Sequence, residues 1–165
     1  MPDVLYVGLQ EDDKIVSFDI DAGSGKLVPS GETPAAGAPS VFAVSPDRRV
    51  LYVGYRGTPA IESCRIDSSS GALTSLGRVA TEHPPTYLAT DRTGTYLLSA
   101  HYQGGYAAVH PLGDTGVVAL RVFVPQALVG ERVAESREER AIVREYVGVV
   151  ERDDPALRPG EHVAK

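Results

Sequence analysis

Short runs of alternating hydrophobic and polar residues, separated by turns rich in glycine and aspartate, fill the first 120 residues of the chain. The run VLYVG at residues 4–8 returns 46 residues later at residues 50–54, and more loosely as YLLSA at residues 96–100. The turn at residues 21–27 returns at residues 67–73 with the same spacing. A period in the forties with short strands predicts β-propeller blades, because helical repeats would show apolar residues about every 3.6 positions.

Each repeat divides into four predicted strands, which is the composition of one propeller blade. In the second repeat they are expected at residues 39–44, 50–55, 60–66 and 73–79. The sequence therefore predicts an all-β fold, an incomplete β-propeller of roughly two and a half four-stranded blades over residues 1–120. Blades of this kind stack on their neighbours, because a single small sheet cannot bury both of its faces.

The charge pattern changes near Arg121. Residues 1–120 contain 21 charged residues, whereas the 45 residues from 121 to 165 contain 17. Residues 131–147 carry good helix formers without a clean apolar stripe, so the second segment is predicted to be an irregular or partly helical tail outside the propeller. Our hypothesis for this abrupt change is a shift of reading frame in the gene.

Composition narrows the classes of partner and cofactor. The formal net charge is −6 and the sequence pI is about 5.2, so binding to nucleic acid or to an anionic membrane surface is not expected. Cys64 is the single cysteine, and the four histidines lack metal-binding spacing, so no metal or other cofactor is predicted. The N-terminal residues do not resemble a secretion signal, and the expected location is cytoplasmic.

Three runs carry a resemblance to a known family: VSPDRRVLYVG at residues 44–54, DSSSGAL at 67–73 and SAHYQGG at 99–105. Together they resemble the propeller-type 6-phosphogluconolactonases, and the likeness extends from residue 4 to about residue 119. The resemblance implies a seven-bladed propeller that hydrolyses 6-phosphogluconolactone in the pentose phosphate pathway, with a sugar lactone as its partner. The alternatives are a relative that acts on muconate lactones and a non-catalytic propeller segment used for binding.

Ligands of propellers usually bind at one mouth of the central channel. That mouth is expected at residues 10–13, 34–39, 56–59, 81–85 and 102–105. Lactone hydrolysis needs a base for water, and this substrate also needs cations for its phosphate. His83 and His101 are therefore the candidate catalytic residues. Arg56 and Tyr102 are the candidates for substrate binding.

Purely structural roles are also open for these four residues. Arg56 could be a solvated loop arginine, the histidines could be held by structural hydrogen bonds, and the glycines after Tyr102 could serve a hairpin turn alone. As implied by the resemblance, further acid, base and cationic residues of the family lie in later blades. We therefore expect an incomplete active site in this chain.

The predicted first blade begins at its second strand, residues 4–8. Without an inner neighbour, this strand would present unpaired backbone groups and an apolar sheet face. The sequence thus predicts self-association through open sheet edges.

Overall fold

The computed structural model describes residues 3–118 and 122–125 of the chain, and this part consists of three antiparallel sheets. Its eleven strands are, in chain order, β1 (Val4–Leu9), β2 (Lys14–Ile20), β3 (Leu27–Pro34), β4 (Pro39–Val44), β5 (Val50–Tyr55), β6 (Ala60–Ile66), β7 (Leu73–Ala80), β8 (Tyr87–Thr90), β9 (Tyr96–His101), β10 (Tyr106–Pro111) and β11 (Val122–Pro125). Within these residues no helix has the length and apolar character that a membrane span requires.

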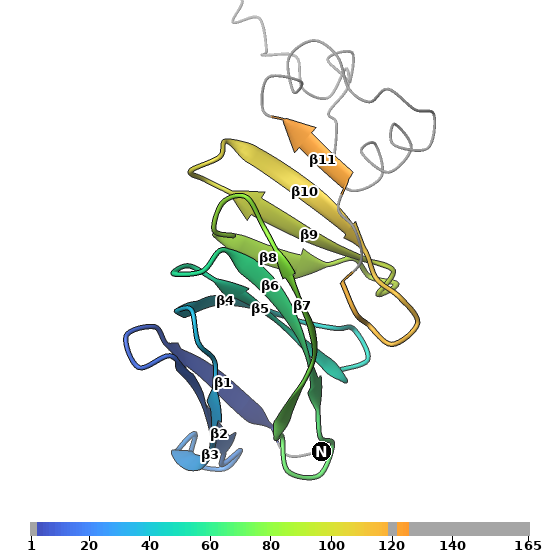
Figure 1. The fold of residues 1–165 in the computed structure, drawn as a ribbon. Helices are drawn as coiled ribbons and strands as arrows, with labels where there is room; N and C mark the ends of the chain where they lie inside the picture. The colour runs from blue at the N-terminus through green and yellow to red at the C-terminus, as the bar shows by residue number, and fades with distance from the viewer. Residues whose placement is uncertain (1–2, 119–121, 126–165) are drawn as a thin grey trace, which may run out of the picture.

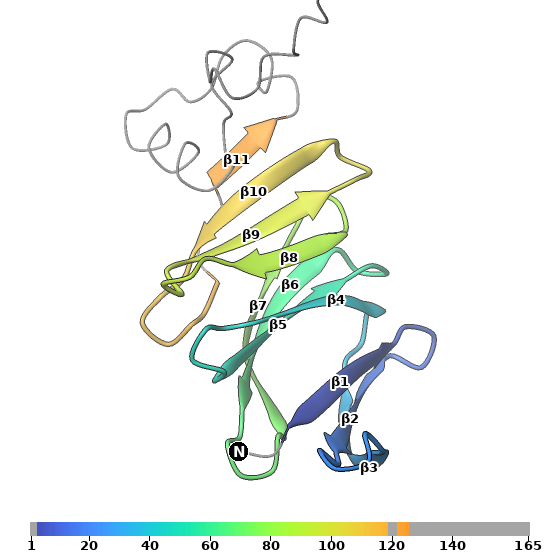
Figure 2. The same ribbon diagram turned by 180° about the vertical axis from the view of Figure 1, so that it is seen from behind.

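The sheets fan out one after another, so that each stacks on the next (Figures 1 and 2). The first blade is β1-β2-β3, the second is β4-β5-β6-β7, and the third is β8-β9-β10-β11. The second blade lies between the other two in both views. The all-β, incomplete propeller predicted from the sequence is confirmed.

Strand register repeats with the same period as the sequence. Val4 pairs with Asp19 in the first blade, and Val50 pairs with Arg65 in the second. Both members of the second pair lie 46 positions after those of the first. The irregularity between Ser17 and Phe18 likewise recurs between Ser63 and Cys64. The period therefore fixes the backbone pairing as well as the sequence of each blade.

The third blade extends past the end that the sequence analysis gave to the propeller. β11 pairs with β10 from Tyr106 to Val109, although it begins after residue 120. Regular blade structure therefore continues into the charged segment. The helix expected at residues 131–147 lies outside the described residues.

Two apolar clusters join the blades, one on each face of the second blade. Leu51, Val53 and Tyr55 pack with Ile15 of the first blade in one cluster. Val50, Tyr52 and Ile61 pack with Leu88 and Leu97 of the third blade in the other. Successive residues of β5 point to opposite faces, which explains why this strand is apolar throughout and buried at every position.

The glycine of the repeated VLYVG run marks where the next blade approaches most closely. A Cβ on Gly8 would lie 2.7 Å from the carbonyl oxygen of Pro39, at the start of the next blade. A Cβ on Gly54 would lie 2.7 Å from Cγ of Pro85, just before the third blade. Glycine recurs here because a side chain would push neighbouring blades apart.

The repeated aspartate turn is held by its own side chain. Asp67 Oδ1 accepts hydrogen bonds from the backbone N–H groups of Ser69 and Ser70, at 3.1 and 2.9 Å. Gly71 closes the turn with a positive φ of 72°, which favours glycine. Hydrogen bonds from both serine side chains, and then from their backbone N–H groups, lower the pKa of Asp67. Asp21 has a lowered pKa in the equivalent turn, where Ser24 is the main donor.

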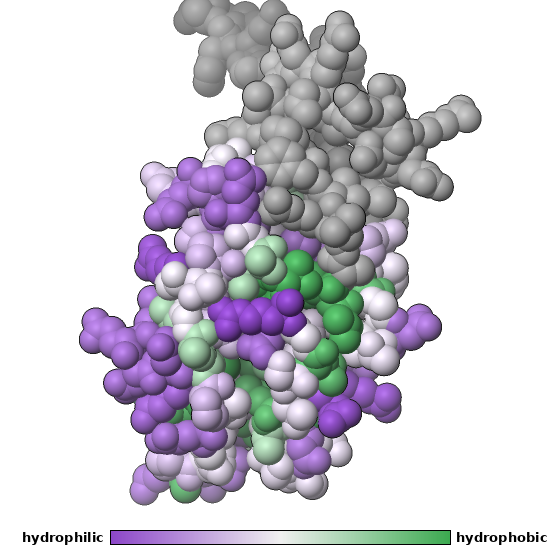
Figure 3. Space-filling view, viewed as in Figure 1, coloured by the Kyte–Doolittle hydropathy of each residue, from purple (hydrophilic) through white to green (hydrophobic). Residues whose placement is uncertain are grey.

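The first blade exposes apolar side chains on the face that points away from the second. Leu5 and Ile20 are each 37% exposed, and Leu27, which pairs with Ile20 in the outer strand, is 49% exposed. In the space-filling view, hydrophilic residues gather at the left margin, where the β1–β2 and β5–β6 turns lie, and a hydrophobic area lies right of centre (Figure 3). Self-association through the first blade stays a prediction.

Replacing Leu51 by alanine should destabilise the domain by about 2–5 kcal/mol, because a fully buried leucine leaves a cavity between two blades. Leu51 is 1% exposed. Leu5, its equivalent in the first blade, is 37% exposed, and Leu5→Ala is the matched control. Urea unfolding followed by circular dichroism measures both variants. Equal losses of stability would contradict the proposed packing of the second blade.

Acid should weaken the turns at Asp21 and Asp67. Their folded-state pKa values lie below the unfolded value of about 3.9, so their contribution is present above that pH and is lost as the pH falls through the folded values. Asp67→Asn should therefore lower the melting temperature at pH 7, and the difference from wild type should shrink below about pH 4. Asp12→Asn, an exposed carboxylate without a hydrogen bond in the described part, is the control. A pH-independent difference would refute this.

Candidate functional site

The loops predicted to form one mouth lie together at one end of the blades. Successive hairpin turns of an antiparallel sheet alternate between its two ends, so the β5–β6 and β9–β10 turns share an end. The loop between the first two blades joins them there, since Arg56 N–H donates to Ala38 O over 2.9 Å and Gly57 N–H to Gly37 O over 2.9 Å. Thr81 N–H likewise donates to Pro59 O at 3.0 Å.

His101 is the best-defined of the predicted site residues. Its ring is 1% exposed and its Nδ1 lies 2.7 Å from the carbonyl oxygen of His83. A carbonyl can only accept, so Nδ1 of His101 carries a proton. In the neutral ring Nε2 is then an acceptor, and it lies 2.8 Å from Oγ of Ser99. Both ring nitrogens are therefore engaged inside the protein.

The hydrogen-bond chain continues to a second buried histidine. Ser99 Oγ lies 2.9 Å from Nε2 of His110, which is fully buried. If the serine hydroxyl donates to His101, it accepts from His110, whose Nε2 then carries the proton. The chain crosses from β10 through β9 to the loop that holds His83. It fixes the tautomers of both rings and ties the mouth loop to the blade.

His83 lies at the mouth with its ring half-buried. Its centroid is 5.9 Å from that of Tyr106, in an edge-on arrangement, while Tyr106 stacks on His101 at 4.3 Å. A Cβ on Gly104 would lie 2.7 Å from Nδ1 of His83. Gly104 therefore allows close packing around His83. The buried Nδ1 has no hydrogen-bond partner in the described residues.

Arg56 and Tyr102 occupy the tips of the two hairpin turns. Both side chains are exposed, Tyr102 by 86%, and neither has a hydrogen bond in the described part of the chain. The structure thus joins the two histidines through a backbone carbonyl and leaves the two binding candidates in solvent. Catalysis by His83 and His101 and binding by Arg56 and Tyr102 stay predictions.

Sequence reasoning missed Arg78, which binds the first two blades together at this end. Its guanidinium donates to Ala36 O at 2.8 Å and to Thr58 O at 3.2 Å. The same group lies 3.7 Å above the centroid of Tyr55, which itself hydrogen-bonds to Glu62. Burial, followed by the effect of Glu62, raises the pKa of Tyr55. The cation lies on the outer strand β7, where no local motif indicates it.

Among the described residues, no group of three or more histidine, cysteine or acidic side chains is placed to hold a metal ion. Cys64 is 4% exposed within the first interblade cluster. Burial, with a smaller effect of Glu62, raises its pKa to about 12, so the thiol stays protonated near neutral pH.

Residues 4–142 match the family model described as lactonase, seven-bladed beta-propeller. The chain belongs to this lactonase family. The match extends beyond residue 120, so the resemblance ends later in the chain than the sequence analysis placed it. A 6-phosphogluconolactonase from Serratia proteamaculans is 39% identical over 119 residues, which are 72% of this chain and 35% of that protein. The chain therefore spans about a third of this lactonase relative.

Solved structures share the fold. The periplasmic gluconolactonase PpgL from Pseudomonas aeruginosa superposes with a TM-score of 0.64 at 23% identity, over 74% of this chain and 37% of that one. A protein from Lactobacillus plantarum superposes with a TM-score of 0.65 at 24% identity, over 76% and 38%. The Swd1 propeller domain from Myceliophteria thermophila also superposes, at 0.55 and 17% identity over 74% and 41%. At these identities the likeness is to the propeller architecture alone.

Replacing Ser99 by alanine should destabilise the domain by about 1–3 kcal/mol, because the substitution removes the hydroxyl between two buried imidazoles. Nitrogen-15 shifts of the His101 ring, measured by NMR in the wild type, should show a protonated Nδ1. Ser40→Ala, which removes one hydrogen bond to Gly54 O, is the matched control and should cost less. An Nε2-protonated His101 would be inconsistent with the hydrogen-bond chain.

Proposed function

We propose that the protein hydrolyses a sugar lactone, 6-phosphogluconolactone, to 6-phosphogluconate as a step of the pentose phosphate pathway, and that this chain supplies three of the blades. The observation that carries the proposal is the 39% identity with the Serratia 6-phosphogluconolactonase within the lactonase family. The identity spans the loops of the candidate mouth. Likeness in fold alone would not carry it, because the same architecture serves unrelated proteins.

Hydrolysis requires water to attack the lactone carbonyl and the ring C–O bond to break. Nε2 of His83 suits the base that takes a proton from water, since the half-buried ring lies at the mouth. The hydroxide adds to the carbonyl carbon, the ring C–O bond then breaks, and the imidazolium returns its proton to the ring oxygen. His101 suits a positioning residue here, since its Nδ1–H holds the carbonyl of His83.

The phosphate of this substrate requires a cation at some distance from the base. Arg56 suits that role, because its guanidinium is exposed at the same end of the blades and can make two parallel hydrogen bonds to an oxyanion. The hydroxyl of Tyr102, on the neighbouring turn, is available to a sugar hydroxyl. The remaining groups of the site would come from further blades.

A chimera tests the proposal directly. Residues 4–125 of this chain replace the matching blades of the Serratia relative, and hydrolysis is followed in a coupled assay against the spontaneous rate. The chimera should hydrolyse 6-phosphogluconolactone. His83→Ala should lower kcat/KM by about 100-fold, as expected for loss of a general base.

Arg56→Ala in the same chimera should raise KM by about tenfold and leave kcat nearly unchanged, as expected for a group that binds the substrate phosphate. Arg92→Ala, an exposed arginine on the β8–β9 turn at the other end of the blades, is the control and should keep full activity. A folded chimera without lactonase activity would refute the proposal. Preference for muconolactone would instead indicate the muconate-lactonising branch.

A further inference from the structure

A cleft of about 600 Å³ opens at the end of the blades opposite the candidate mouth. The β4–β5 turn, the β8–β9 turn and the loop after β10 surround it, so it lies between the second and third blades. This volume falls in the range of small-molecule sites, roughly 300–1,000 Å³. The lining residues named here lie in the described part of the chain, and nothing in the proposed lactonase chemistry uses the cleft.

The cleft combines an apolar floor with a polar rim. Side chains of the second interblade cluster form the floor, namely Val50, Tyr52, Leu76 and Leu112. Two arginines and two aspartates stand at the rim together with threonine hydroxyls, namely Arg49, Arg65, Asp47, Asp114, Thr93 and Thr95. The lining therefore offers oxyanion donors and hydroxyl acceptors above a hydrophobic surface.

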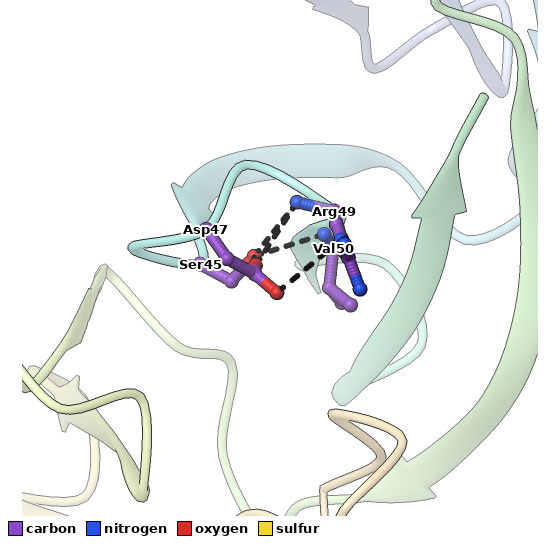
Figure 4. Close-up of polar contacts among 4 residues, drawn as sticks. All are labelled: Ser45, Asp47, Arg49 and Val50. Atoms are coloured by element: carbon purple, nitrogen blue, oxygen red, sulfur yellow. Dashed lines mark hydrogen bonds and ion pairs between the residues drawn. The ribbon is translucent and has the colours of Figure 1, made fainter. Parts of the chain in front are cut away.

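The Ser45 turn on one side of the cleft is rigid. Ser45 Oγ accepts from the backbone N–H groups of Arg49 and Val50, at 3.1 and 2.9 Å, and donates to Asp47 Oδ1 at 2.6 Å (Figure 4). The hydrogen bond from Ser45 also lowers the pKa of Asp47. The turn thus holds Arg49 at the rim before any ligand binds.

The loop on the other side is tied to both blades. Leu112 N–H donates to Thr95 O at 2.8 Å, and Val118 N–H donates to Oγ of Ser63 at 3.2 Å. Gly116, with φ of 75°, lies against the second blade, where an added Cβ would be 2.8 Å from Val50. Both walls are therefore preformed, which reduces the entropy lost on binding.

Neither arginine is strongly engaged within the protein. Arg49 Nε lies 3.8 Å from Asp47 Oδ2, and both side chains are largely exposed, so this ion pair contributes little. The exposed side chain of Arg65 has no hydrogen bond or ion pair among the described residues. Val50 pairs with Arg65, and Ile66 N–H donates to Arg49 O at 2.8 Å, which brings the two arginines to adjacent strand ends.

We propose that this cleft is a second binding site, for a hydroxylated organic anion of sugar size. Arg49 and Arg65 donate to its carboxylate or phosphate. The aspartates and threonines accept hydrogen bonds from its hydroxyl groups, and its C–H face lies on the apolar floor. The rim carries two positive and two negative side chains, so directed hydrogen bonds, and not net charge, select the ligand.

Binding to the full chain is measured by NMR titration of backbone amides with three probes: 6-phosphogluconate, gluconate and inorganic phosphate. The two sugar acids should shift the amides of Thr95, Gly113 and Gly116, and both should bind more tightly than inorganic phosphate. The two acids distinguish a phosphate from a carboxylate as the recognised group. Arg65→Gln should weaken binding by about tenfold or more, as should Arg49→Gln.

Arg56→Gln is the matched control, because it removes the same charge at the opposite end of the blades. It should leave these shifts and affinities unchanged, whatever its effect on lactone hydrolysis. Loss of binding in Arg56→Gln, with Arg65→Gln unaffected, would overturn the proposal by placing the anion at the mouth. Equal affinity for phosphate and the sugar acids would also overturn it. So would absence of shifts at the cleft in the wild-type protein, or an unchanged affinity in an Arg65→Gln variant that keeps native amide dispersion.

Discussion

The stacking of blades face to face is the constraint on which the rest of the structure depends. Each sheet has apolar surface to bury and is too small to be stable alone. The second blade meets this constraint fully, because Leu51 packs towards the first blade and Val50 towards the third. Loops at either end of the blades hold their positions only because this packing fixes the distance and twist between neighbouring sheets.

The two interfaces use equivalent positions for different purposes. Val53 and Tyr55 face the first blade, and the residues 46 positions later, Ser99 and His101, face the second. A hydrogen-bonded chain thus replaces an apolar contact beside the candidate mouth. Hydrogen bonds between buried polar groups restrict the geometry more than apolar packing does, which suits a loop that must present His83 in one orientation.

The two ends of the blades have different chemistry. The mouth end carries the histidine chain and Arg56, where lactone hydrolysis is proposed. The opposite end carries the rigid Ser45 turn and a preformed cleft, where a hydroxylated anion is proposed. Because successive connections alternate between ends, the same repeated unit supplies two loops to each surface. A propeller can thereby vary its two surfaces independently while the strands between them stay constant.

The sequence by itself determined the period, the strands, the turn chemistry and the family, because register and turns depend on residues within a few positions of each other. It also located the mouth loops that contain His83 and His101. Only the tertiary structure showed that His101 is buried, that Arg78 joins the first two blades, and that a cleft lies between the second and third blades. These features arise where residues distant in sequence meet, such as Ser63 with Val118, and no local pattern encodes which side chains the next blade will cover.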